Sequence, residues 1–373
     1  MTTTQEQAKA YARIRYRLFF MNLAVTVLFL FFFQLSGLSA ALADWARRVT
    51  SFEPAALALY LLVFGALTYL VDFPLHLYRS WFLEHRFGLS RLNARGWCVR
   101  ELKHLAVNGI LGLILVESLY ALFRSAPRTW PIWAAAGWIF LSVVLARVFP
   151  TMLLPIFYKT KPVENPALVE RLVALCNRVG VDALGVFRFD LGAETRKANA
   201  MLAGLGRSRR VILSDTLMEH FPEEEIEGVL AHELAHHHFR HIPKGLALAA
   251  VGSLVGFFLT AWAAPLWLAP LGLNGLADIA GFPALSLWLS VMGLVGMPVQ
   301  NAISRAFEWQ ADRFAVWMSA SPKVFAQALR RLGELNLADP NPPAWIEWFF
   351  FDHPSIGRRV QAAEQAAWVR TEP

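Results

Sequence analysis

His232, Glu233 and His236 form the pattern H-E-x-x-H, and their types and spacing predict metal-dependent chemistry. Two histidines four residues apart lie on one face of a helix, so both imidazoles can bind the same metal ion. The glutamate between them can take a proton from a water molecule at that metal and act as a general base. The pattern predicts a zinc protease site, and its alternative is a solvated polar helix face.

A catalytic zinc ion usually has three protein ligands and one position open to water, so a further ligand is expected elsewhere in the chain. The segment 308–312, Glu-Trp-Gln-Ala-Asp, supplies Glu308 as a candidate. Asp312 lies four residues on, along the same helical face, and can accept the free N–H of a ligand histidine. The alternative for the two carboxylates is a helix face paired with Arg305 and Arg313. Three more histidines crowd the first motif, and we expect them to support the site or to lie on the surface: His237, His238 and His241.

The composition is typical of a membrane protein. Of the 373 residues, 56% are hydrophobic and 17% are charged, whereas a soluble domain is about 45–50% apolar and about 25% charged. The net charge of +7 does not indicate nucleic-acid binding, because the basic residues lie mostly beside apolar segments and in the polar segment. Cys98 and Cys176 lie far apart and predict neither a disulfide framework nor metal ligands.

Six segments are long and apolar enough to cross a bilayer, whose hydrocarbon core requires about 20 helical residues. The first has a basic start like that of a signal peptide, but it is too long and five more follow it, so we predict a retained anchor. Four segments precede a long polar segment at 158–242, and two follow it. The predicted spans are 18–39, 55–77, 104–123, 130–157, 245–270 and 282–303.

The basic residues predict the orientation, because cytoplasmic loops carry an excess of Lys and Arg. Four precede the first span and six lie in the predicted loop 78–103, whereas the loops on the other face carry few. The N-terminus, the polar segment and the C-terminus are therefore expected on the cytoplasmic side. The predicted division of the chain is a membrane domain of four spans (1–157), a catalytic segment (158–242), two further spans (243–304) and a C-terminal catalytic segment (305–373).

The polar segment has its own predicted order of elements. A helix is expected at 168–179, and short strands rich in Val, Phe and Ile are expected at 184–190 and 210–214. A third strand is expected between them, at 198–205. Pro222, followed by three glutamates, is typical of a helix start, because acidic groups favour the positive end of the helix dipole. That helix carries the H-E-x-x-H pattern.

The chain resembles the integral-membrane zinc proteases of the CAAX prenyl protease type 1 family. The resemblance implies a mainly α, polytopic membrane protein with about six transmembrane helices around a cytoplasmic-side, gluzincin-like zinc protease domain with a small β-sheet. It also implies one zinc ion per chain, a peptide or protein substrate that can be membrane-associated or lipidated, and a bacterial-type member in the inner membrane. The motifs that carry it are HELAH at 232–236, E-x-x-x-D at 308–312, Lys-Ala-Asn-Ala at 197–200, H-P-x-x-x-x-R at 353–359 and the segment 83–89.

The resemblance implies roles at the metal, residue by residue. His232, His236 and Glu308 would bind zinc. Glu233 would be the general base, and Asp312 would orient a ligand histidine.

It also implies roles at the substrate. Asn199 would hold the substrate backbone along an edge strand, and His353 would steady the oxyanion of the scissile carbonyl. Arg359 would support the cleft. The alternatives are a turn residue for Asn199, a capping or surface histidine for His353 and a surface charge for Arg359.

Two other functions are weighed against a membrane-embedded zinc endopeptidase. An intramembrane site-2-type protease also uses H-E-x-x-H, but there the motif lies within an apolar span, whereas here Glu223–Glu227 and Arg240 flank it. A non-catalytic transporter or pseudo-enzyme scaffold with a structural metal would use charged residues within the membrane, for which Asp72 and Glu117 are candidates. Zinc content and the effect of Glu233→Gln distinguish these classes.

Overall fold

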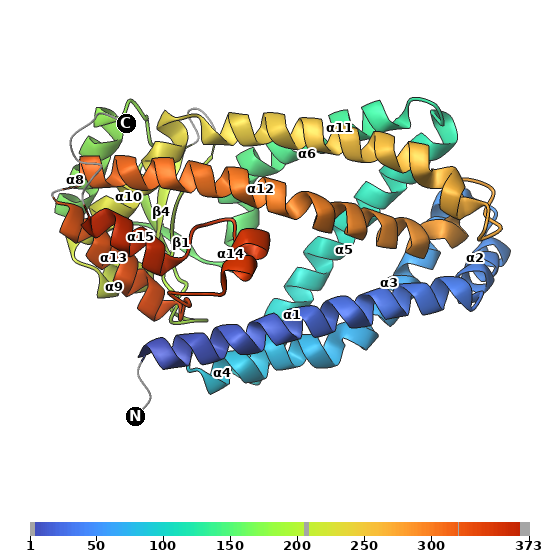
Figure 1. Ribbon diagram of the computed structural model, residues 1–373, viewed down its shortest axis with the longest axis horizontal. Helices are drawn as coiled ribbons and strands as arrows, with labels where there is room; N and C mark the ends of the chain where they lie inside the picture. The colour runs from blue at the N-terminus through green and yellow to red at the C-terminus, as the bar shows by residue number, and fades with distance from the viewer. Residues whose placement is uncertain (1–3, 205–208, 320, 366–373) are drawn as a thin grey trace.

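The computed structural model describes residues 4–204, 209–319 and 321–365. These residues form a mainly helical protein with one four-stranded sheet. Figure 1 shows the sheet and several short helices gathered at one end of the long axis, and long helices that run from there toward the other end. Leu205 of the predicted third strand and residues 366–373 of the predicted C-terminal segment lie outside the described residues.

Six helices within the described ranges are long and apolar enough to cross a membrane, which confirms the predicted number. Two of these spans each consist of shorter helical pieces that follow one another without a gap. The helical spans are α1 (Thr4–Leu35), Glu53–Arg86, α5 (Ala94–Ser125), α6 (Trp130–Val148), α11 (His241–Leu268) and Ile279–Met318. The second comprises α3 (Glu53–Leu77), the π-helical turn η1 (Tyr78–Leu83) and α4 (Glu84–Arg86), and the last comprises the turn η4 (Ile279–Gly281) and α12 (Phe282–Met318).

The predicted bounds differ from the helices after the second span, and the fourth span changes its helix type along its length. The loop expected at 78–103 is wrong in extent, because the helix before it runs to Arg86 and α5 begins at Ala94. Backbone hydrogen bonds can extend a helix beyond its apolar segment. Hydropathy therefore predicts the apolar part of the helix but not where the helix ends. The fourth span was expected to run to 157, and helical structure does reach Phe157, through α6, the π-helical turn η2 (Phe149–Leu153) and α7 (Leu154–Phe157). Pro150 lacks a backbone N–H, which is consistent with the change from α-helical to π-helical hydrogen bonding after Val148.

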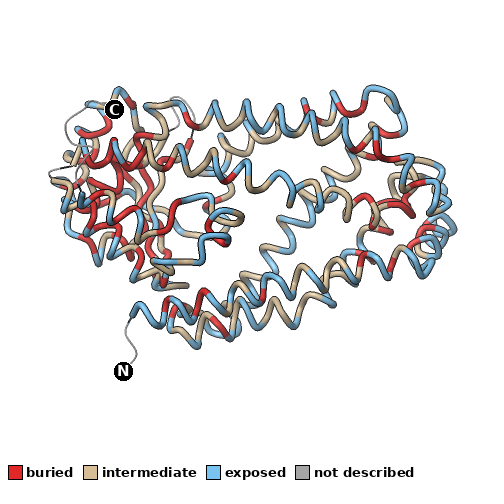
Figure 2. The backbone as a smooth tube through the Cα atoms, viewed as in Figure 1, coloured by how far each residue is buried: buried red, intermediate tan, exposed pale blue. Residues whose placement is uncertain are grey.

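Burial is distributed as expected for a protein in a bilayer. Buried residues concentrate at the two ends of the molecule, whereas the long helices between them are mostly half-buried or exposed (Figure 2). Leu62, Phe140 and Trp262 are 70%, 70% and 73% exposed. Apolar side chains on the outside of such helices are stable in hydrocarbon and costly in water. At the end far from the sheet, α2 (Leu38–Val49) closes the bundle through a core that includes Leu57, Tyr60 and Ile279.

The sheet has the strand order β1-β2-β4-β3, with β2 and β4 parallel and the two outer pairs antiparallel. Three of its strands lie within the segments predicted from sequence, and β1 was not predicted. β3 is an edge strand, so one side of its backbone is not paired with another strand. The strands are β1 (Thr160–Pro162), β2 (Val186–Phe189), β3 (Ala200–Ala203) and β4 (Arg210–Ser214).

The core beside the sheet fixes the helix that carries the H-E-x-x-H pattern. This helix, α10 (Glu223–His238), begins after Pro222 with three glutamates in its first turn, as predicted. Its Leu230 and Leu234 are buried against the sheet residue Leu213 and the helix residue Phe325. The other helices at this end are α8 (Pro166–Arg178), α9 (Asp215–His220), α13 (Pro322–Leu335), α14 (Ala344–Phe350) and α15 (Ile356–Glu364).

Candidate metal centre

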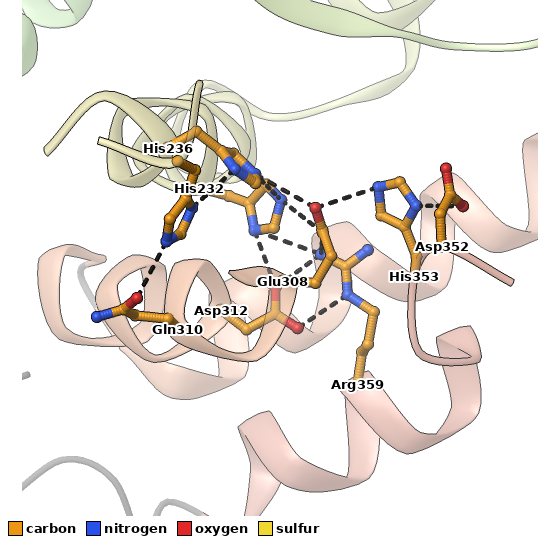
Figure 3. Close-up of polar contacts among 9 residues, drawn as sticks. His232, His236, Glu308, Gln310, Asp312, Asp352, His353 and Arg359 are labelled. Carbon is orange, nitrogen blue, oxygen red and sulfur yellow. Dashed lines mark hydrogen bonds and ion pairs between the residues drawn. The ribbon is translucent and has the colours of Figure 1, made fainter. Parts of the chain in front are cut away.

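Two helices bring the predicted metal ligands together. α10 presents His232 and His236 on one face, and the C-terminal half of α12 presents Glu308 toward them (Figure 3). The Nε2 atoms of the two histidines are 3.4 Å apart. Glu308 places Oε2 at 3.2 Å from Nε2 of His232 and Oε1 at 3.4 Å from Nε2 of His236.

These separations fit a tetrahedral metal ion. Zinc binds imidazole nitrogen and carboxylate oxygen at about 2.0–2.2 Å, and ligands at that radius on a tetrahedron are about 3.3–3.6 Å apart. The ligand atoms of His232, His236 and Glu308 lie within 4.8 Å of one another and constitute the metal-binding group found among the described residues. Glu308 Oε2 is buried and makes no hydrogen bond within the described structure, although it lies close to His232. A cation between the three side chains would satisfy this oxygen.

The surroundings of His232 and His236 shift their two pKa values in opposite directions. Burial lowers the pKa of His232, but its contacts with Asp312 and Glu308 outweigh burial and raise the pKa to about 9. Burial, together with the charge of His232, lowers the pKa of His236 to about 3. His236 is therefore neutral at pH 7, the state in which imidazole binds a metal.

Asp312 and Arg359 form a buried pair behind His232. Asp312 is 0% exposed, and its Oδ1 lies 2.9 Å from Nδ1 of His232. Arg359 on α15 donates from Nε to Oδ2 at 2.8 Å and from Nη2 to Oδ1 at 2.6 Å. An Nδ1–H donated to Asp312 leaves Nε2 of His232 free to bind a metal. The sequence also allowed Arg305 to pair with these carboxylates. In the structure, Arg305 instead donates to the carbonyl oxygens of Glu347 and Phe351.

Glu233 and His353 flank the metal-binding group. Glu233 is half-buried on α10, and burial, against the opposing effect of His232, raises the pKa of its carboxyl above the ordinary value. His353 lies between α14 and α15, with Nε2 3.3 Å from Glu308 Oε1 and Nδ1 2.8 Å from Asp352 Oδ1. Burial opposes charge on His353, but Asp352 and Glu308 raise its pKa above the ordinary value. The side chain is half exposed, so a substrate can reach it.

His353 and Arg359 also line a cavity of about 610 Å³. Its other walls come from the start of α1, the end of α13 and the segment before α15. Aromatic and aliphatic side chains dominate these walls, and basic groups stand among them. The cavity is lined in part by Tyr11, Arg15, Phe19, Lys197, Met297 and Phe350. Such a space suits an extended chain with apolar side chains.

Asn199 lies immediately before β3 and is exposed. Its carbonyl accepts from Ser214 N at 2.9 Å, which makes Asn199 and Ser214 a hydrogen-bonded pair of the antiparallel ladder. Ala200 is then a non-hydrogen-bonded position, so its N–H and C=O point to the free edge of β3. Side chains alternate along a strand, which places the Asn199 side chain on the same face as Met201, away from the α10 side that buries Ala198 and Leu202. The structure thus brings together seven of the eight predicted residues, and it places Asn199 at the neighbouring strand.

Sequence reasoning missed two residues at the site. Asn336 pairs its amide with the backbone of Ala198, accepting from N at 2.9 Å and donating to O at 3.2 Å. Gln310 contacts His241, which in turn contacts His236. Gln310 lies within the 308–312 motif, but it does not share the helical face of Glu308 and Asp312, so the spacing assigned it no role. No spacing rule links Asn336 to β3.

Two family models match the chain. The model of peptidase family M48 matches residues 162–367, and the model described as "CAAX prenyl protease N-terminal, five membrane helices" matches residues 2–159. The chain belongs to peptidase family M48. It is an integral-membrane metalloprotease, and the resemblance stated from the motifs is confirmed. Within the matched N-terminal part, four described helices are long and apolar enough to cross a membrane.

Known proteins resemble this member of family M48 over most of its length. The "Uncharacterized metalloprotease YhfN" of Bacillus subtilis is 24% identical over 362 residues, which cover 96% of this chain and 85% of that protein. The CAAX prenyl protease 1 of Saccharomyces cerevisiae is 26% identical over 325 residues, which cover 82% of this chain and 71% of that protein. The crystal structure of S. mikatae Ste24p aligns with a TM-score of 0.87 at 22% identity, and it covers 97% of this chain and 89% of that one. This structural likeness shows the fold.

Proposed function

We propose that this membrane metalloprotease is a zinc-dependent endopeptidase of the gluzincin type, with one zinc ion held by His232, His236 and Glu308. The observation that carries the proposal is the spacing of the three ligand atoms, 3.2–3.4 Å apart. The carboxyl of Glu233 is close enough to His232 and Glu308 for their charges to affect it. The donor set of two imidazoles and one carboxylate is that of catalytic zinc sites. When bound, zinc supplies Lewis-acid polarisation of a carbonyl and lowers the pKa of water.

The residues of the chain carry out the proton transfers in this proposal. Glu233 takes a proton from the attacking water as its oxygen adds to the peptide carbonyl carbon. The same carboxyl gives that proton to the leaving nitrogen as the C–N bond breaks, so the products are a carboxylate and an amine. The raised pKa of Glu233 brings the carboxyl closer to the working pH, which favours both transfers.

His353 stabilises the oxyanion of the scissile carbonyl in this proposal. Its Nε2 faces the metal-binding group at 3.3 Å from Glu308, and Asp352 holds the other ring nitrogen at 2.8 Å. A ring with both nitrogens protonated can donate from Nε2 toward negative charge that develops at the carbonyl oxygen. Arg359 and Asp312 act one step further away, by fixing the ring of His232.

The substrate proposed is a peptide or protein segment bound in extended form, and it includes membrane-associated and lipidated chains. The free edge of β3 at Ala200 offers one N–H and one C=O for pairing with such a segment, and Asn199 would add an amide contact. The cavity beside His353 and its apolar walls support this substrate class. No nucleic acid is proposed as a partner.

The proposed location is a bacterial inner membrane with the catalytic part in the cytoplasm. The start of α1 packs near the site, because Tyr11 shares a buried cluster with Leu83 and Leu337. The start of α1 and both catalytic segments therefore lie at one end of the molecule (Figure 1), and the excess of basic residues supports a cytoplasmic position for this end. We retain the division into 1–157, 158–242, 243–304 and 305–373 as the functional division of the chain.

Metal removal is expected to abolish cleavage reversibly. The detergent-purified full chain should contain about one zinc per chain, and dialysis against a chelator should remove zinc and activity together. Zinc added back should restore cleavage of an unfolded casein-type reporter, because the three ligands are preformed by α10 and α12. Elemental analysis and reporter fluorescence provide the measurements. Cleavage that persists in metal-free protein would contradict the proposal.

His353→Ala is expected to lower kcat by about 10²–10³-fold and to change KM little, because one oxyanion donor is lost. Steady-state kinetics on the same reporter measure this split. His220→Ala is the matched control, since His220 lies at the end of α9 and bonds the carbonyl of Thr216. A capping or surface role for His353 would instead give kinetics like those of the control.

A further inference from the structure

His241 is a buried histidine whose two ring nitrogens both have partners. It is the first residue of α11 and is 4% exposed. Its Nδ1 lies 3.0 Å from Nδ1 of His236, and its Nε2 lies 3.0 Å from Oε1 of Gln310. The His241 ring stacks on Phe307 at a centroid distance of 4.3 Å and an interplanar angle of 8°. Contacts therefore run from Gln310 through His241 to His236, whose other ring nitrogen, Nε2, faces the metal-binding group.

The backbone between α10 and α11 is bent to put His241 there. Arg240 has φ 55° and ψ 40°, the left-handed conformation that is unfavourable for a residue with a Cβ. This conformation reverses the chain after α10, so the first residue of α11 folds back against His236. Backbone strain of this kind persists where the surrounding contacts require it. Here the surrounding contacts are the aromatic stack and the two hydrogen bonds of His241.

The contacts allow one consistent arrangement of protons when His236 binds a metal through Nε2. His236 then carries its proton on Nδ1 and donates it to His241, so Nδ1 of His241 must be bare. His241 therefore carries its proton on Nε2, where the side-chain oxygen of Gln310 accepts it. Every donor in this chain has an acceptor. If the NH₂ group of Gln310 faced His241 instead, it would meet the N–H at Nε2 of His241, and neither donor would have an acceptor.

We propose that His241 and Gln310 are positioning residues that hold His236 in its metal-binding tautomer and ring orientation. This inference rests on the proposed function, because zinc is the ion that His236 would bind. α12 then orients both ligand histidines while also supplying Glu308: Asp312 fixes His232 directly, and Gln310 fixes His236 through His241. Figure 3 shows Gln310 and Arg359 on opposite sides of the histidine pair. Because His241 begins a membrane-spanning helix, the metal geometry is tied to the position at which α11 starts.

Zinc affinity of the detergent-purified full chain tests the proposal without any substrate. Affinity is measured by competition with a chromophoric zinc chelator, and the visible spectrum of cobalt-substituted protein reports ligand geometry. His241→Phe keeps the aromatic stack and removes the acceptor, and it should weaken zinc binding by about 10–100-fold and alter the cobalt spectrum. His241→Asn places an amide oxygen near the lost nitrogen and should recover most of the affinity. The matched control is His238→Phe, since His238 is exposed at the end of α10, the helix that carries His236, and contacts the rings of Phe239 and Phe314.

A second pair of variants keeps the test decisive if His241→Phe fails to fold. Gln310→Glu retains an acceptor and should bind zinc as the unaltered chain does, whereas Gln310→Leu should bind it more weakly. Equal affinity in these two variants, or His241→Phe within twofold of the unaltered chain, would overturn the positioning role and leave the proposed protease intact. An unaltered chain that binds no zinc would instead refute the proposed zinc site, and the positioning role with it.

Discussion

Glu233→Gln is expected to lower kcat by about 10²–10⁴-fold and to leave zinc content and zinc affinity unchanged. The amide has the size of the carboxylate but cannot take a proton from water. Glu233 lies between the two ligand histidines in sequence, but it is not one of the three residues of the metal-binding group. Its replacement therefore does not remove a ligand. Reporter cleavage and elemental analysis on the same preparation separate the two effects.

The control for this experiment is Glu224→Gln on the same helix. Glu224 is exposed in the first turn of α10 and contacts Arg171, so its loss should leave kcat within twofold of the unaltered chain. Zinc-loaded Glu233→Gln that cleaves the reporter within tenfold of the unaltered rate would exclude Glu233 as the base. Loss of zinc in this variant would point to a structural role for the carboxylate.

Arg359→Leu is expected to lower the free energy of unfolding by about 3–5 kcal/mol, the cost of leaving one partner of a buried ion pair alone. Arg359 is 8% exposed and Asp312 is 0% exposed, so water cannot replace the lost hydrogen bonds. The stability of Arg359→Lys should lie between that of Arg359→Leu and that of the unaltered chain, because lysine keeps the charge but cannot make both hydrogen bonds to the carboxylate. Denaturant or thermal unfolding of the metal-free, detergent-solubilised chain measures these differences.

The adjacent arginine is the matched control. Arg358 also pairs with a carboxylate, Glu347, at 2.8 Å, but its side chain is 60% exposed. An exposed pair contributes about 0–1 kcal/mol, so Arg358→Leu should change stability little. If the two arginine variants were equally stable, the buried pair behind His232 would not be a stability determinant.

The sequence alone predicted most residues of the candidate metal centre. The spacing of His232 and His236 fixes them on one helical face whatever surrounds the helix, because the period of an α-helix is local. The same argument placed Glu308 and Asp312 on one face. The number of membrane spans was also predictable, since it depends on the length of apolar segments. The pairing of Glu308 with the histidines of α10 was expected because catalytic zinc needs a third ligand and because the motifs resemble those of a known family, and it did not follow from any local rule.

The ends of helices were harder to predict than their number. The apolar segment that begins at 55 was predicted to end at 77, yet the helix continues to Arg86 because its backbone hydrogen bonds do not depend on hydropathy. The strand β1 has three residues and no distinctive pattern, so its assignment depends on pairing with β2.

Only the tertiary structure decided which polar residues serve the centre. His241 and His238 are both near-neighbours of the motif, and nothing in their spacing distinguishes the buried one from the exposed one. The left-handed turn at Arg240 makes that distinction, because it folds His241 back toward His236 and Gln310. Asn336 reaches the edge of β3 from the end of α13 in the same way. Contacts of this kind join segments that are distant in the chain, so packing and not sequence spacing sets them.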